Sequence, residues 1–185
     1  MLKKVLLAIV VVVAVLAVVV ATRPSTYRIQ RSIHLAAPPE VTYAQVVSLH
    51  RWEAWSPWAK LDPGMKVEYG GPESGPGATY AWKGNKEVGE GRMTILDATP
   101  SRRVQLRLEF LAPMKDEAST SFDLAPAGDG TEVTWSMAGQ LGFVGKAMCL
   151  VTSMDRMVGP DFERGLSSLK STAEAEAQHP TATAK

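Results

Sequence analysis

Residues 104–110, VQLRLEF, alternate strictly between apolar and polar side chains. Successive side chains of a β-strand point to opposite faces, so this segment predicts a strand with one apolar and one polar face. Residues 117–124 and 132–137 repeat the pattern, and the turn sequence APAGDG at 125–130 separates them. Half-apolar strands joined by short turns predict an antiparallel sheet that is covered on one face only.

A C-terminal segment, from residue 153 to about residue 170, can cover that face. Its apolar residues recur at helical spacing: Met154, Met157, Val158, Phe162, Leu166 and Leu169. Gly159 and Pro160 predict a kink or a restart of this helix. Gly165 lies in mid-helix, where glycine is unfavourable, and suggests a close approach to the sheet. Residues 172–185 lack aromatic side chains and are expected to form a disordered tail.

Toward the N-terminus, alternation marks further strands at 27–35, 65–69, 80–82 and 93–95. A helix is expected to begin within AAPPE, because proline and Glu40 suit a first helical turn. Arg31 is the exception on the apolar face of its strand. The order of one strand, helices, about six strands and a long helix predicts an α+β domain over residues 27–171, with an antiparallel sheet wrapped around the C-terminal helix.

Three of the five tryptophans lie close together in RWEAWSPWAK, at Trp52, Trp55 and Trp58. Pro57 prevents a regular helix from continuing, so we expect a short helical turn that ends near Trp55 and a loop that carries Trp58. The group could stack on a substrate, anchor the chain to a membrane, or close one end of the core. We favour the last interpretation, with one ring touching a ligand.

The N-terminal segment 1–22 contains only Val, Leu, Ala and Ile from Val5 to Ala21. About 20 apolar residues span a bilayer as a helix, so we expect a single uncleaved transmembrane anchor, followed by a linker at 23–26. A cleaved signal peptide is the alternative, since VVA before Thr22 resembles a cleavage site. Basic residues flank both sides, and the export-like leader favours a domain on the extracytoplasmic side.

Composition and motifs exclude several classes of function. The net charge is +1 with dispersed Lys and Arg, which argues against nucleic-acid binding. A single cysteine and three histidines without metal spacing predict no disulfide framework and no metal site. Phosphate-loop and G-x-S-x-G strings are absent, so no cofactor and no catalytic residue is assigned. Asp97, Asp116 and Glu90 remain weak acid/base candidates near strand ends.

Two strings, WSPWAKLDPGMKVEYGGPESGPGATYAWKGNKEVGEGRMTI at 55–95 and GPDFERGLSSLK at 159–170, resemble one known group. This group is the bacterial polyketide cyclase/dehydrase and lipid-transport-like branch of the SRPBCC (START/Bet v 1-like) superfamily. The resemblance implies a helix-grip fold with an apolar cavity between sheet and long helix, which holds lipids, polyketides or other apolar molecules. It also implies an N-terminal anchor in a bacterial inner membrane, which many members of this branch carry, and offers no invariant catalytic motif.

We therefore expect a membrane-tethered, non-catalytic binding protein for a hydrophobic small molecule or lipid. A cyclase/dehydrase-like enzyme and an interaction module with a solid core are the alternatives, and the oligomeric state stays open. Arg31 either extends its charge to water or provides a counter-charge for a ligand carboxylate. The expected cavity residues are Arg31, Trp55, Trp58, Tyr80, Trp82, Met93, Phe110, Trp135, Met137, Met154, Met157 and Phe162.

Overall fold

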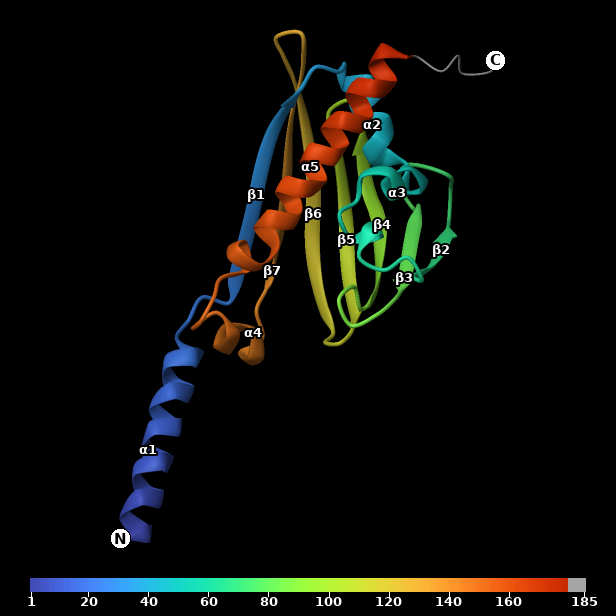
Figure 1. The fold of residues 1–185 in the computed structure, drawn as a ribbon. Helices are drawn as coiled ribbons and strands as arrows, with labels where there is room; N and C mark the ends of the chain where they lie inside the picture. Colours follow the sequence, from blue (N-terminus) through green and yellow to red (C-terminus); the bar gives the residue numbers. More distant parts are fainter. Residues whose placement is uncertain (180–185) are drawn as a thin grey trace.

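The computed structural model describes residues 1–179, and the chain forms a curved sheet with one long helix along its concave face (Figure 1). The strands are β1 (Thr26–Leu35), β2 (Lys66–Gly70), β3 (Thr79–Lys83), β4 (Glu90–Thr99), β5 (Arg103–Ala112), β6 (Asp116–Ala127) and β7 (Gly130–Gln140). They form an antiparallel sheet in the order β1-β7-β6-β5-β4-β3-β2. The predicted helix-grip architecture is therefore confirmed.

The helices divide into a long one and several short ones. Helix α5 (Met154–Gln178) crosses the sheet and buries Phe162, Leu166 and Leu169 against it. The segment between β1 and β2 holds α2 (Pro39–Val47), η1 (Leu49–Arg51), α3 (Trp52–Trp55) and η2 (Trp58–Lys60). A six-residue helix, α4 (Phe143–Met148), connects β7 to α5.

The tryptophan segment folds as its sequence predicts. Helix α3 ends at Trp55, and Trp58 begins the separate turn η2 after Pro57. Trp55 is fully buried and packs edge-on against Phe122 and Trp135, with ring centroids 5.8 and 5.9 Å apart. This cluster forms the centre of the hydrophobic core.

Helix α5 differs from the prediction at two places. Pro160 lies inside a continuous helix, so the helix does not restart there. The helix also continues to Gln178 instead of ending near residue 170, so residues 172–178 of the expected tail are helical. Glu174 Oε1 accepts a hydrogen bond from the backbone N–H of Ala36, and Glu176 binds Arg51, which together hold this last turn against the domain. Residues 180–185 of the expected tail lie outside the described residues.

The close approach predicted at Gly165 is confirmed. A Cβ at this position would lie 2.7 Å from the ring of Trp135 and 3.1 Å from Pro57. Only a residue without a side chain lets α5 pack this closely on β7 and on the proline that follows α3.

The N-terminal helix α1 (Leu2–Ala21) extends away from the domain (Figure 1). An 18-residue window of this helix has a mean hydropathy of 3.2, so the helix is long and apolar enough to cross a membrane, although a signal sequence has the same properties. Four residues, 22–25, link it to β1.

Candidate ligand-binding cavity

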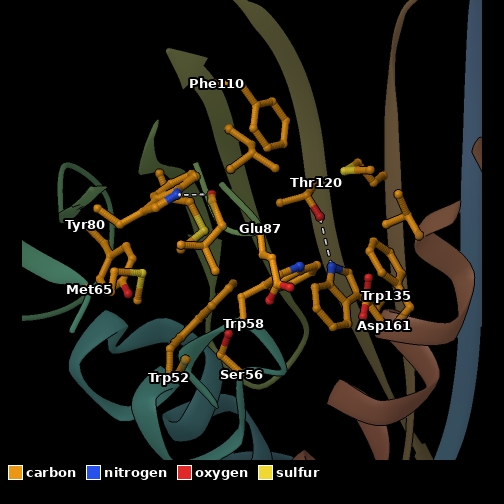
Figure 2. A pocket seen from close by; sticks show the side chains of 18 of the residues that line it. Trp52, Ser56, Trp58, Met65, Tyr80, Glu87, Phe110, Thr120, Trp135 and Asp161 are labelled. Carbon is orange, nitrogen blue, oxygen red and sulfur yellow. Dashed lines mark hydrogen bonds between the residues drawn. The ribbon is translucent and has the colours of Figure 1, made fainter. Parts of the chain in front are cut away.

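A cavity of about 240 Å³ lies between the sheet, the N-terminal half of α5 and the α3–η2 segment (Figure 2). Tyr80 and Trp82 come from β3, and Trp135 comes from β7. Met154 and Phe162 close the cavity from α5. One water occupies about 30 Å³ of liquid, so this space is large enough for a small organic ligand. The interior is not filled as the solid-core alternative requires.

Aromatic rings give the cavity rigid walls. Trp135 stacks on Phe162 with ring centroids 4.0 Å apart, and Trp58 meets Trp135 edge-on at 5.8 Å. On the other side, Trp82 packs edge-on against Phe110 at 6.3 Å. Each ring is held by another ring, so the cavity keeps its shape without a ligand.

Thr120 and three indole N–H groups of the cavity wall are already bonded within the protein. The Thr120 hydroxyl donates to the carbonyl oxygen of Ser136 at 2.8 Å and accepts the indole N–H of Trp135 at 3.0 Å. The indole N–H of Trp82 donates to the carbonyl of Val88 at 3.0 Å. Trp52 donates to the carbonyl of Val46 at 2.9 Å. The inner surface therefore presents mainly carbon and sulfur to a ligand.

Charge appears only at the border of the cavity. Glu53, Glu87 and Asp116 line it and are exposed, while Asp161 is half-buried and forms an ion pair with Arg164. Among residues 1–179, no Lys, Arg or His lines the cavity. A bound anion would meet these carboxylates without a cation from the wall, which makes the cavity unfavourable for a ligand with a negative charge.

Two tyrosines of the wall have raised pKa values. Burial is the main cause for Tyr27 and, with the nearby charge of Asp116, raises its pKa to about 12. Burial also raises the pKa of Tyr80 to about 12, with smaller contributions from Tyr69 and Glu53. Both side chains are therefore neutral near pH 7.

The structure brings most of the sequence-predicted cavity residues together on this wall. They are Trp58, Tyr80, Trp82, Met93, Phe110, Trp135, Met137, Met154 and Phe162. Trp55 instead lies in the core behind the wall, and Met157 is on the exposed side of α5. Of the acid/base candidates, Asp116 lines the cavity, whereas Asp97 and Glu90 do not.

Arg31 does not line the cavity, so it provides no counter-charge there; its head extends instead to the surface beside the edge strand β1, as the first interpretation expects. Its guanidinium donates to Asp155 and Glu163 of α5, with N–O distances of 2.7 Å to each. Gly159 makes room for it, since a Cβ there would lie 2.3 Å from the guanidinium. The hydrogen bonds from Arg31 hold the pKa of Asp155 below its usual range. Arg31 thus fastens β1 to α5.

Several wall residues were not predicted. Tyr27, Trp52, Met65, Leu108 and Val158 lie on apolar faces that the sequence pattern already marks, so the period-two and helical spacings could have found them. The same spacing places Thr120 on the inner face between Ala118 and Phe122, although threonine is not itself an apolar residue.

A sequence profile described as "Polyketide cyclase / dehydrase and lipid transport" matches residues 26–174, which is the whole of the sheet and most of α5. The chain belongs to this family. Family membership and the apolar cavity together indicate a hydrophobic-ligand-binding or polyketide cyclase/dehydrase-like protein. A search of curated protein sequences finds no match.

Solved structures share the fold at low sequence identity. A protein from Chromobacterium violaceum is 17% identical with a TM-score of 0.57, over 82% of this chain and 99% of the other. Ara h 8.0201 is 13% identical with a TM-score of 0.54, over 83% and 98% of the two chains. The di-domain ARO/CYC StfQ from the steffimycin biosynthetic pathway is 12% identical with a TM-score of 0.59, over 83% of this chain and 52% of that chain. These similarities concern the fold alone.

Proposed function

We propose that this protein is a membrane-tethered, non-catalytic binding protein for an uncharged hydrophobic molecule held in the cavity between the sheet and α5. The observation that carries the proposal is the inner surface of the cavity. On this surface, hydrogen bonds within the protein engage the Thr120 hydroxyl and the indole N–H groups of Trp82 and Trp135. A ligand without polar groups gives up no hydrogen bonds of its own when it enters such a site. Its binding is favoured by the free energy of moving apolar surface out of water.

The ligand's charge follows from the border of the cavity. The exposed carboxylates of Glu53, Glu87 and Asp116 line the cavity, and Arg31 is engaged by Asp155 and Glu163. A fatty-acid carboxylate would therefore be repelled at the mouth and unpaired inside. A neutral lipid or another neutral apolar molecule fits both features.

The tether is the second part of the proposal. Helix α1 has the length and hydropathy of a membrane span, and only four residues separate it from β1. Such a tether keeps the cavity near the bilayer, where apolar molecules concentrate. We propose that the domain lies on the extracytoplasmic side of the bacterial inner membrane, because Lys3 and Lys4 at the start of α1, followed by an apolar run, resemble an export signal.

One observation favours the alternative of a cyclase-like enzyme. Asp116 lines the cavity, and its charge acts on Tyr27, so two titratable groups lie near one end of the site. However, Asp116 is exposed, and its Oδ1 accepts the backbone N–H of Glu117 at 2.9 Å. Tyr27, with a pKa of about 12, is a weak acid at neutral pH. Tyr27 is therefore poorly tuned for proton transfer near pH 7, where a catalytic pKa should lie.

A matched pair of probes tests the binding site. N-phenyl-1-naphthylamine is neutral, and 8-anilino-1-naphthalenesulfonate has almost the same rings with a negative charge. The detergent-solubilised full chain should bind the neutral probe at least about tenfold more tightly, a difference of roughly 1.4 kcal/mol. Equal binding of both probes, or tighter binding of the sulfonate, would contradict the proposed ligand class.

Two tryptophan substitutions on β5 separate cavity binding from uptake by detergent. Leu108→Trp fills the cavity, whereas Arg107→Trp adds the same side chain on the opposite, exposed face. Binding of the neutral probe should be lost in the first variant and kept in the second. Native mass spectrometry of the same samples would show whether a neutral molecule co-purifies. If Leu108→Trp binds the probe like the unchanged protein, the cavity is not the site.

A further inference from the structure

Large apolar side chains are exposed in the short connection between β7 and α5. We call them the α4 patch: Phe143, Val144, Met148, Leu150 and Val151. Phe143 is 57% exposed and Val151 is 89% exposed. Isolated apolar residues on a surface are ordinary, but a contiguous group of this kind marks a surface that contacts a membrane or another protein.

The α4 patch is continuous with the apolar surface of α1. Helix α4 packs against the C-terminal end of α1 (Figure 1), and Val20 in the last turn of α1 is buried. Lys146 Nζ lies 3.4 Å from the carbonyl oxygen of Ala21, the last residue of α1. The patch is therefore placed where a spanning α1 would leave the hydrocarbon layer.

Charge around the patch suits a lipid surface. Residues 141–154 contain Lys146 and no Asp or Glu, and residues 22–28 contain Arg23 and Arg28 and no Asp or Glu. Apolar side chains flanked by Lys and Arg are typical of segments that lie in the membrane interface, because the cations attract anionic lipid headgroups.

The cavity reaches this same end of the domain. Tyr27 is near the start of β1, Asp116 is the first residue of β6 and Met154 is the first residue of α5. The register pairs Tyr27 with Gly139, next to the end of β7 from which the chain enters α4. Tyr27 follows Ala21 by six residues, so an extended chain places it at most about 20 Å from the end of α1.

We propose that the α4 patch inserts into the interfacial layer of the bilayer that holds α1, and so keeps the end of the domain that contains Tyr27, Asp116 and Met154 turned toward lipid. The occupant of the patch is lipid because the patch continues the surface of a helix that is itself suited to lipid. The inference rests on the proposed function for the tether alone, and it is independent of which molecule the cavity binds.

Fluorescence quenching on the full chain in vesicles tests this contact. Cys149 is the only cysteine, so a Cys149→Ser chain can carry one introduced cysteine with an NBD label. Val151→Cys places the label in the patch. Asp129→Cys places it in the exposed β6–β7 turn, at the opposite end of the sheet from α4. The vesicles contain phosphatidylcholine and phosphatidylglycerol, with or without a lipid that carries a doxyl group at acyl carbon 5.

The doxyl lipid should quench the label at Val151→Cys at least about twofold more than the label at Asp129→Cys, because interfacial segments reach the boundary of the acyl chains. Adding Phe143→Asp and Val144→Asp to the Val151→Cys chain should abolish that difference. Equal quenching at both sites in chains that float with the vesicles overturns the contact and leaves the tether intact. Failure of the chain to float overturns both the tether and this contact, while probe binding in detergent still reports on the cavity.

Discussion

Arg31 Nη1 lies 2.7 Å from Asp155 Oδ1, across the junction between the first strand and the first turn of the long helix. A second hydrogen bond from the same guanidinium, Nη2 to Asp155 Oδ2 at 3.1 Å, makes the contact bidentate. The Arg31 side chain is 27% exposed, so the pair is partly shielded from water. It fixes the end of α5 that supplies Met154 and Val158 to the cavity.

The ion pair should make stability depend on pH in acid. The pKa of Asp155 is lowered in the folded protein, first by the hydrogen bonds from Arg31. A lowered pKa stabilises the fold fully above the unfolded value of about 3.9, and this contribution is lost as pH falls through the lower folded value. Thermal unfolding of the full chain and of Asp155→Asn between pH 2 and 7 measures it.

In Asp155→Asn, the melting temperature should be lower than that of the unchanged protein at pH 6, and the two should converge near pH 2. Arg28→Gln is a matched control, because Arg28 lies on the outer face of the same strand and bonds only to the neighbouring Gln30 among the described contacts. If Asp155→Asn and the unchanged protein keep a constant difference from pH 6 to pH 2, the pair does not stabilise the fold as described.

Trp55 and Trp58 should respond differently to truncation, although only two residues lie between them. Trp55 is fully buried behind the cavity wall, so Trp55→Ala should lower the free energy of unfolding by about 3–5 kcal/mol. Trp58 is half-buried on the wall itself, so Trp58→Ala should cost less stability and weaken binding of a neutral probe more. Denaturant unfolding and probe titration measure the two effects. Similar stability losses in both variants would mean that Trp58 belongs to the core.

The sheet and the long helix could be predicted because each has one apolar face, and a periodic pattern records that face directly. Val104 and Leu106 on β5, and Phe162 and Leu166 on α5, are all buried as the pattern predicts. Most cavity residues could be predicted for the same reason. The cavity wall is the part of these apolar faces that is not fully covered by the opposite layer.

Three features could not be predicted, because they depend on partners that are distant in the sequence. In the sequence, Arg31 is an unpaired charge on an apolar strand face, and only the fold brings Asp155 and Glu163 beside it. The polar residues 172–178 of α5 were predicted to be disordered, because the sequence does not show that Glu176 pairs with Arg51. Trp55 was predicted as a cavity residue because no periodic pattern distinguishes which of the three tryptophans lies on the cavity surface and which lies in the core behind it.

Gly165 should tolerate no side chain without a loss of stability. Its Cβ would lie 2.7 Å from Trp135 and 3.1 Å from Pro57, both of which are ring atoms held in place by their neighbours. Alanine gains up to about 1 kcal/mol of helix propensity over glycine, but overpacking costs about 1–3 kcal/mol. Gly165→Ala should therefore lower the free energy of unfolding by about 1 kcal/mol. Gly142→Ala, where nothing lies within 4 Å of the added carbon, is the control and should change it little.

The tyrosines of the cavity should ionise well above their ordinary pKa of 10. Burial, the largest cause, raises the pKa of Tyr27 and of Tyr80 to about 12. In each case the folded protein holds the proton more tightly than the unfolded chain does. The resulting stabilisation is therefore fully present below pH 10 and is lost as pH rises toward about 12.

The absorbance of tyrosinate near 295 nm follows this ionisation, because the phenolate absorbs there and the phenol does not. A titration of the folded chain should show two tyrosines, Tyr27 and Tyr80, that ionise late, near pH 12. Tyr80→Phe should remove one of these two late groups. A neutral ligand that fills the cavity excludes further water, so it should move the remaining late group to still higher pH. If the late groups titrate near pH 10 with or without ligand, water already enters the cavity, and the dry inner surface on which an uncharged ligand depends does not exist.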